Sequence, residues 1–538
     1  MGKEIMQRRD LLKMTSAGLA AAAAPATAAA LNARGGTGQE LSGQGIAGFN
    51  VRQFGAKGDG ANIDSSAINR AIDAAAAAGG GTVIFPAGVY LSYSIRLKSK
   101  VGLYLDHGTQ ILAAPTSSTA SGGYDLAEPQ GAWEPYQDYG HNHWHNSLIW
   151  GEDLEGVSIT GPGLIWGKGL NHGWENEADQ AAATQSGAGN KSIALKNCRN
   201  VLLRDFRILE GGWFGILATG VDNLTVDNLL IDTNRDGMDI DCCRNVRISN
   251  CTVNSPWDDG ICPKSSYALG YARATENLTI TNCYVTGGFA LGSVLDGTWK
   301  RSDNRGSTTT GRIKLGTESN GGFRNITISN CVFESCQGFA LETEDGALVE
   351  DITFTGITMR DIRSAPLFLR LGTRMRGPLD AKPGVMRRVI LSNIVSSGAS
   401  QLPSILSGVP GHPIEDVKIS DVYLEQAGGG TAEMAALEPE EHEADYPEPS
   451  MFGRLPATGF FLRHVRNLEM SNVEIATRDA DARAAFWLKD VVGADFFRAR
   501  IPEGTAPAFD LRQVREFRSF GSRQLADLTL ENVEQRKI

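Results

Sequence analysis

A short phrase with alternating apolar and polar positions returns along the chain. It starts with a charged residue, usually followed by asparagine, and then places apolar side chains at the third and fifth positions. Its clearest copies are RNVLL at 199–203, DNLTV at 222–226, RNVRI at 244–248, ENLTI at 276–280 and RNITI at 324–328. Weaker copies begin at positions 350, 415 and 466. Strict alternation of this kind predicts a half-buried strand, with Val246 and Ile248 inward and Arg247 outward.

The spacing of the phrase indicates a solenoid. Asn200 and Asn223 are 23 residues apart, and Asn223 and Asn245 are 22 apart. Several short strands in a coil of about 22 residues are typical of a parallel β-helix, and asparagine tolerates the left-handed backbone of a coil corner. A β-sandwich would need more hairpin turns than the chain offers. We therefore predict an all-β protein with a right-handed parallel β-helix over residues 111–535, interrupted by inserted loops.

An N-terminal cap precedes the coils. Residues 65–75 have a helical pattern that Gly79–Gly81 ends, and the strand-like run 81–86 follows. Because the exposed core end of a solenoid needs a cover, residues 48–110 are expected to form a helix-containing cap with the first coils. Loops are expected at 114–150, 266–275 and 296–310, and the acidic stretch 438–449 is interpreted as a solvated loop.

The first thirty residues have the features of an export signal. Arg8 and Arg9 precede an alanine-rich run that ends in a small-residue cleavage pattern at 26–28. We interpret residues 1–30 as a twin-arginine signal and expect a periplasmic or secreted protein. No stretch reaches about 18 consecutive apolar residues, so no membrane span is expected.

Charge and cysteine content exclude further classes. The formal net charge is −11, and no basic stripe with interleaved aromatic residues occurs, so nucleic acid is not an expected partner. Three of the eight cysteines, Cys251, Cys283 and Cys331, follow an asparagine in one repeated position. Stacked small apolar side chains explain them, and we predict mostly free thiols. We expect a monomer.

Two neighbouring coils carry an excess of carboxylates, in NRDGMDID at 234–241 and WDDGICPK at 257–264. Asp236 precedes Asp258 by 22 residues, one coil, which predicts side chains about 4.8 Å apart along the axis. A diagonal offset would widen this toward the roughly 6.5–9.5 Å of inverting glycosidases. Because grouped carboxylates repel, one of Asp236, Asp258 and Asp259 should hold a proton and serve as a general acid.

Further residues are candidates for holding a sugar. Arg312 and Lys314 lie two positions apart on an expected strand, suited to a carboxylate or hydroxyls, although ordinary solvation would also explain the pair. Trp257 could stack on a sugar ring, and Glu318 could line the groove. If extended, residues 141–145 would project three histidines to one side. Sugar contact or loop packing is favoured there over a metal, and no metal or cofactor is predicted.

The ordered motifs resemble glycoside hydrolase family 28, the polygalacturonases. They are Asn-x-Asp-Gly at 234–237, Asp-Asp at 258–259 and Arg-Ile-Lys at 312–314, and FGAKGDG at 54–60 is similar to the entry sequence of pectate-lyase-like proteins. The resemblance implies that Asp258 is the general acid, and that Asp236 and Asp259 position and deprotonate water. It further implies that Arg312 and Lys314 hold a sugar acid, and that hydrolysis proceeds with inversion and without a metal.

The sequence departs from that family at two positions. Gly287 stands where the family's Gly-His-Gly motif has histidine, and Arg235 stands where threonine is usual. We expect a glycoside hydrolase acting on a pectin-like, uronate- or rhamnose-containing poly- or oligosaccharide other than ordinary homogalacturonan, or attacking it from a chain end, with His145 a candidate replacement for the histidine. A polysaccharide lyase using calcium at the three aspartates is one alternative. A non-catalytic glycan-binding β-helix is the other.

Overall fold

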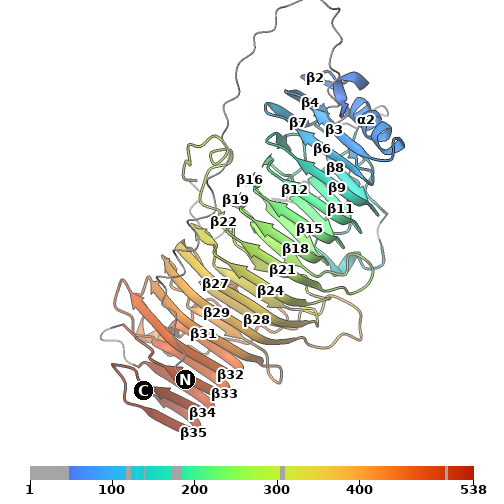
Figure 1. The fold of residues 1–538 in the computed structure, drawn as a ribbon. Coiled ribbons are helices and arrows are strands. Elements are labelled where there is room, and N and C mark those ends of the chain that lie inside the picture. Colours follow the sequence, from blue (N-terminus) through green and yellow to red (C-terminus); the bar gives the residue numbers. More distant parts are fainter. Residues whose placement is uncertain are drawn as a thin grey trace, which may run out of the picture. The chain divides into compact units, whose positions relative to one another are not determined.

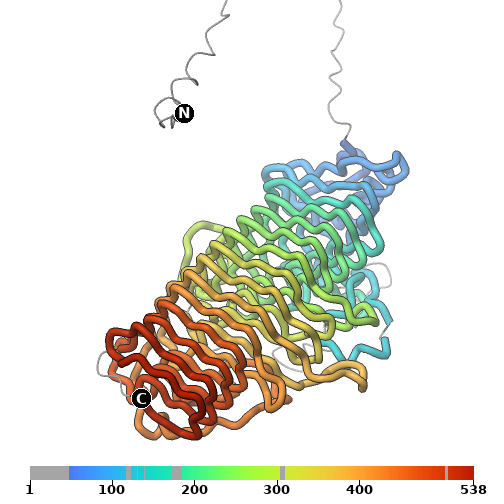
Figure 2. Tube along the Cα trace, turned by 60° about the horizontal axis from the view of Figure 1, so that its bottom comes forward, coloured from blue at the N-terminus to red at the C-terminus, as the bar shows by residue number. Residues whose placement is uncertain are grey.

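Parallel strands stacked coil upon coil build the protein. The computed structural model describes residues 48–116, 123–129, 131–138, 140–172, 185–302, 309–502 and 507–538, and Ala47–Ile538 forms one compact unit. In Figures 1 and 2 successive coils follow one another from the blue to the red end of this unit. The predicted parallel β-helix is confirmed. The expected export signal at 1–30 lies outside the described residues.

Three columns of strands form the faces of the coils. The first contains β3 (Gly81–Phe85), β6 (Val101–Leu105), β9 (Glu155–Thr160), β12 (Arg199–Arg204), β15 (Asp222–Asp227), β18 (Arg244–Ser249), β21 (Thr275–Thr281) and β24 (Phe323–Ser329), with β1 (Phe49–Asn50) beside β3. The second contains β2 (Asp59–Ile63), β4 (Gly88–Ser92), β7 (Thr109–Ala113), β10 (Leu164–Trp166), β13 (Arg207–Leu209), β16 (Leu230–Asp232), β19 (Thr252–Asn254), β22 (Tyr284–Thr286) and β25 (Val332–Glu334).

The third column carries the acidic coils. It contains β5 (Ile95–Arg96), β8 (Ile149–Glu152), β11 (Lys191–Lys196), β14 (Phe214–Thr219), β17 (Asp236–Asp241) and β20 (Ile261–Lys264). It continues through β23 (Lys314–Leu315), β26 (Phe339–Thr343), β28 (Leu367–Leu371) and β30 (Ser404–Ser407). A parallel bridge from Ile261 to Ile313 joins the two parts.

Longer strands complete the C-terminal end. They are β27 (Leu348–Ile362), β29 (Val385–Gly398), β31 (Ile414–Gln426), β32 (Ala457–Thr477), β33 (Ala484–Phe497) and β34 (Phe509–Phe520). The last strand, β35 (Leu528–Lys537), runs antiparallel to β34 and covers the final coil. Short helical turns lie outside the columns: η1 (Val51–Phe54), η2 (Glu134–Tyr136), α4 (Ala432–Ala435) and η3 (Pro449–Phe452). No helix among the described residues is long and apolar enough to cross a membrane.

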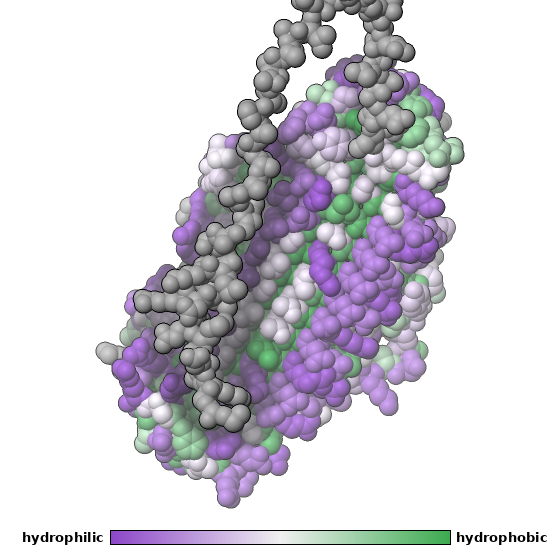
Figure 3. Space-filling model, in the orientation of Figure 1, coloured by the Kyte–Doolittle hydropathy of each residue, from purple (hydrophilic) through white to green (hydrophobic). Residues whose placement is uncertain are grey.

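Alternation along each strand separates the core from the surface. Val246 and Ile248 are fully buried while Arg247 is exposed, as the pattern predicts. In the view of Figure 3, hydrophilic side chains border a narrower band of hydrophobic ones along the stack. All eight cysteines are buried free thiols, which confirms the interpretation of the Asn-Cys positions as core.

The helix of the cap closes the N-terminal end of the core. α2 (Ser65–Ala77) buries Ile68, Ala71 and Ile72 against it. Asp64 stands at its N-cap position but does not cap it with its side chain. Its carboxylate instead accepts hydrogen bonds from the backbone N–H groups of Lys57 (2.7 Å) and Gly58 (2.9 Å), which fixes the FGAKGDG segment against the helix.

A ladder of asparagines holds one corner of the coils in register. Asn200, Asn223, Asn245, Asn277 and Asn325 all have φ between 53° and 58°. From Asn223 onward, each side-chain amide donates to the asparagine one coil earlier, over distances of 2.8–3.2 Å. Asparagine suits this position because it tolerates the left-handed region and can bond along the stack.

The ladder makes a testable contribution to stability. Asn277→Ala puts a residue that tolerates the left-handed region less well than asparagine at positive φ, and it removes two amide hydrogen bonds, so we expect the free energy of unfolding to fall by about 1–2 kcal/mol. Asn277→Gly loses the same bonds without the backbone strain and should lose clearly less. Urea unfolding of both variants measures the difference. Equal losses would show that the left-handed backbone is not what asparagine supplies.

Candidate active site

The fold brings the three predicted aspartates together on adjacent coils. Asp236 opens β17, while Asp258 and Asp259 occupy the turn before β20. The Gly237 N–H donates to the Asp259 carbonyl at 3.0 Å, and the Asp259 N–H donates to Asp236 Oδ1 at 3.2 Å. One oxygen from each carboxylate lies within 4.8 Å of the others. This agrees with the spacing of about 4.8 Å expected for adjacent coils, without the widening toward roughly 6.5–9.5 Å that a diagonal offset could have added.

The aspartates lie in a pocket of about 610 Å³. Its lining residues are Asp138, His141, Trp213, Phe214, Arg235, Asp236, Trp257, Asp258, Asp259, Lys264, Thr310, Lys314, Tyr446 and Glu448. The Asp258 side chain is 22% exposed and that of Asp259 is 4% exposed. Asp236 is buried as well, so Asp258 is the carboxyl most accessible to a ligand.

The environments of the buried aspartates displace their pKa values in opposite directions. Burial raises the pKa of Asp236 well above its ordinary value, and the Asp239 and Asp258 carboxylates raise it further. Burial also acts to raise the pKa of Asp259, but the charges of Arg312 and Lys314 outweigh it and lower the value. Asp236 therefore holds a proton at a pH where Asp259 is ionised.

Arg235, the residue in place of the usual threonine, contacts Asp258. Its Nη2 lies 2.8 Å and its Nε 3.3 Å from Asp258 Oδ2. The guanidinium carbon lies 4.4 Å from the centre of the Trp213 ring, an arrangement that stacks a cation on an aromatic face. The sequence marked Arg235 only as a departure, and its contact with the most exposed aspartate gives that departure a role at the site.

Both cations of the Arg-Ile-Lys motif reach the site, and both are paired within the chain. Arg312 is 1% exposed and donates from Nε to Asp259 (2.9 Å) and from Nη2 to Glu448 (2.5 Å). Lys314 is 3% exposed, with its Nζ 3.6 Å from Asp259 and 3.7 Å from both Glu342 and Glu448. Substrate binding by the two cations stays a prediction, because the chain's own carboxylates occupy them.

A second group of charges supports the aspartates from behind. The Lys264 ammonium lies 3.1 Å from Glu318 and 3.9 Å from Asp239. His141 Nε2 lies 2.9 Å from Asp239 Oδ2. Glu318, a predicted substrate contact, is fully buried outside the pocket lining and pairs with Lys264 and with Arg376 at 3.1 Å. It therefore orients the cations rather than meeting a ligand in this arrangement.

The acidic stretch is not the solvated loop expected from its charge. Residues 438–448, called the acidic strap below, lie across basic side chains of the third face. The Glu438 carboxylate pairs with Lys489 and Arg512, Arg463 donates to the Pro439 and Glu440 carbonyls, and Arg370 donates to the Glu441 and His442 carbonyls. These bonds fix the strap in place, and its far end brings Tyr446 and Glu448 into the pocket.

The histidine segment is not extended. Turns and bends run through residues 141–148, so the imidazoles point to different partners: His141 to Asp239, and His143 to Glu134 at 3.1 Å. The expected single row of histidines is therefore wrong. Only His141 of the three lines the pocket.

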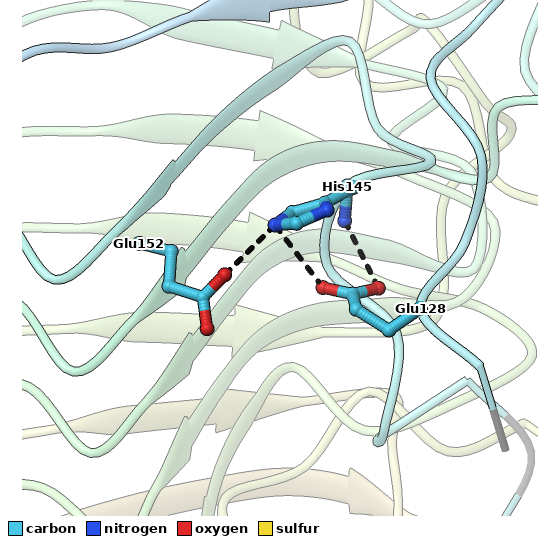
Figure 4. A group of neighbouring side chains, drawn as sticks. All are labelled: Glu128, His145 and Glu152. Carbon is cyan, nitrogen blue, oxygen red and sulfur yellow. Dashed lines mark hydrogen bonds and ion pairs between the residues drawn. The ribbon is translucent and has the colours of Figure 1, made fainter.

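His145 lies in a separate ion-pair group. Its Nε2 is 2.9 Å from Glu152 and 3.5 Å from Glu128, and Glu128 also accepts from the His145 backbone N–H (Figure 4). Such a group could hold a metal ion by its spacing. Lys196, 2.7 Å from Glu152, already supplies a positive charge there. His145 does not line the pocket, whereas Trp257, 44% exposed, does.

Position 287 has no room for the histidine of the family motif. A β-carbon there would lie 2.8 Å from Thr309 Cγ2 and 3.2 Å from the Ser255 carbonyl oxygen. Neighbouring coils have therefore closed over the space that the motif would use. Among the residues lining the pocket, His141 carries the imidazole, and it reaches the site from an inserted loop.

Comparison with known proteins supports the fold. Residues 48–261 match the family model described as Rhamnogalacturonase A/epimerase, pectate lyase-like. A probable polygalacturonase of Vitis vinifera is 24% identical over 363 residues, covering 65% of this chain and 68% of that protein. Over those residues the chain resembles the pectate lyase-like family, and it is a distant homologue of the polygalacturonases. By this distant homology its β-helix resembles those of pectin-active glycoside hydrolases.

Solved structures support the same fold. An exopolygalacturonase of Thermotoga maritima is similar with a TM-score of 0.57 at 20% identity, over 80% of this chain and 91% of that one. A family 28 exopolygalacturonase of Yersinia enterocolitica gives 0.59 at 19% identity, over 83% and 78% of the two chains. At these identities the polygalacturonase homologue shares their architecture, while its substrate has to be argued from its own pocket.

The close packing around Gly287 can be tested by its effect on the free energy of unfolding. We expect Gly287→Ala to lower the free energy of unfolding by about 1–3 kcal/mol, because the added methyl overpacks the contact with Thr309. Thr309→Ser removes the opposing methyl and keeps the hydroxyl, so the double variant should regain part of the loss. Thermal unfolding of the two single variants, the double variant and the parent gives the double-mutant cycle for this contact. A fully stable Gly287→Ala protein would contradict the closed packing.

Proposed function

We propose that the protein is a glycoside hydrolase that cleaves a pectin-like poly- or oligosaccharide by carboxylate acid–base catalysis. The observation that supports this most directly is the opposite displacement of the Asp236 and Asp259 pKa values beside an accessible third carboxyl. A proton donor and an ionised base within one pocket are what hydrolysis of a glycosidic bond requires.

The three carboxyls divide the chemistry by environment. The site holds one proton, resting on Asp236 in the free protein, and Asp258 presents it to the glycosidic oxygen because its side chain is the most exposed. As the carbon–oxygen bond breaks, that oxygen takes the proton. Asp259 accepts a proton from the water whose oxygen bonds to the anomeric carbon. Inversion is proposed on the family resemblance, although the short carboxyl spacing is nearer to that of retaining pairs.

The proposed chemistry uses no metal. A lyase would need the three aspartates to bind calcium, yet Arg235 pairs with Asp258, and Arg312 with Asp259. Side-chain cations thus already neutralise two of the three carboxylates that calcium would need. Export to the periplasm or beyond is proposed from the paired arginines, the alanine-rich run and the cleavage pattern of residues 1–30.

Substitution of the aspartates tests the mechanism. Asp258→Asn and Asp259→Asn should each lower kcat by about 10³-fold, because each removes one proton transfer. The exposed Asp296, outside the pocket lining, supplies the matched control, and Asp296→Asn should keep kcat. Products from pectic and rhamnose-containing oligosaccharides are followed by NMR, which also identifies the anomer formed first. Unsaturated products, or activity abolished by a chelator, would instead establish a lyase.

The pH profile of kcat/KM tests the assignment of the proton. The pKa of Asp259 is lowered, so the acid limb should lie below 3.8, the ordinary pKa of an aspartate. The pKa of Asp236 is raised, so the alkaline limb should lie well above that value. Burial also raises the pKa of Glu342, beside Lys314, to about 7. If Asp236 is the group that holds the proton, Glu342→Gln should leave the alkaline limb in place. Loss of that limb in the variant would assign it to Glu342 instead of Asp236.

A further inference from the structure

Glu448 stands where a ligand's carboxylate would have to bind. Its Oε1 lies 2.5 Å from Arg312 Nη2 and 3.7 Å from Lys314 Nζ. Both cations are almost fully buried, and both also contact Asp259. Three carboxylates of the chain, including Glu342, therefore surround these two positive charges, and no charge remains for a bound anion.

The strap that carries Glu448 is anchored at both ends. Met434 is buried before it, and Phe452 after it packs against Phe461 in a buried cluster with Trp487. Between these anchors the backbone carbonyls of the strap accept hydrogen bonds from buried arginines. Displacing Glu448 would leave Arg312 buried without one of its partners, which is costly. The carboxylate is a fixed part of the pocket wall.

The rest of the pocket also disfavours a charged sugar. Its acidic lining residues are Asp138, Asp236, Asp258, Asp259 and Glu448, and its basic ones are Arg235, Lys264 and Lys314. The acids and cations of this lining are paired with one another, Arg235 with Asp258, and Lys314 with Asp259 and Glu448. A further carboxylate buried among them would lose its hydration and bring no new counter-charge with it. Two exposed aromatic side chains of the lining, Trp257 and Tyr446, offer apolar faces instead.

We infer that the sugar bound in this pocket is an uncharged pyranose, and that Glu448 excludes uronates by occupying Arg312 and Lys314. The inference rests on the proposed hydrolase function and narrows its substrate: the ring held beside Asp258 is a neutral hexose or deoxyhexose, even where the polymer contains uronates elsewhere. Glu448 thereby acts as a specificity determinant, because it satisfies the same cations that a uronate carboxylate would use.

A pair of ligands that differ only in charge tests this on the intact protein. Oligogalacturonide and its carboxyl-reduced form share linkage and stereochemistry, so calorimetric binding to the wild-type chain isolates the carboxylate. We expect the reduced form to bind at least tenfold more tightly. Equal binding, or tighter binding of the oligogalacturonide, would overturn the inference without any variant being made.

Glu448→Gln then removes the charge and keeps the shape. The expected result is at least a tenfold gain in affinity for oligogalacturonide, while affinity for the reduced form changes little. Glu440→Gln is the matched control, because Glu440 lies in the same strap with an exposed side chain and contacts Arg463 only through its carbonyl. A Glu448→Gln protein that melts like the parent and gains nothing would also overturn the inference.

Binding and turnover separate this inference from the proposed function. If the wild-type protein selects the neutral ligand but hydrolyses no glycoside tested, the function fails and the role of Glu448 stands. If it hydrolyses uronate bonds with Glu448 intact, and does so as well as neutral ones, the hydrolase stands and the role of Glu448 fails.

Discussion

Parallel stacking of one coil directly on the last is the constraint on which the rest of the structure depends. The asparagine ladder and the parallel pairings hold successive coils in register, so residues one coil apart in sequence become neighbours in space. This is why Asp236 meets the Asp258–Asp259 turn, and why Ile313 pairs with Ile261. A coil that slipped by one residue would turn these side chains from the pocket face into the core.

The same stacking brings like charges together, and the site depends on how their repulsion is relieved. Carboxylates on adjacent coils repel and lose hydration, so the cluster is stable only with cations or a proton among them. Arg312 and Lys314 hold Asp259 ionised, Lys264 lies behind the group, and Asp236, with Asp239 and Asp258 near it, takes the proton. Stability of the folded state and readiness for acid–base chemistry thus have one physical origin.

The sequence predicted what repetition carries. The β-helix, the free stacked cysteines and the adjacency of Asp236 and Asp258 follow from regular spacing, and the ordered motifs located Arg312 and Lys314. The features that could not be predicted depend on inserted segments, whose contacts do not follow the repeat. The histidine segment, for example, was expected to be extended. Nothing in its composition showed that the acidic strap would fold onto the third face.

Glu448 illustrates why such contacts cannot be predicted from the sequence. It lies 136 residues after Arg312, in a run of acidic residues typical of a solvated surface. Only the folded coils show that basic side chains lie beneath this run. Because a solenoid leaves its catalytic coil unchanged when a loop elsewhere is lengthened, an insertion can alter the ligand's surroundings without touching the aspartates. In the mechanism proposed above, the three carboxyls then keep their chemistry, while the strap selects the sugar that reaches them.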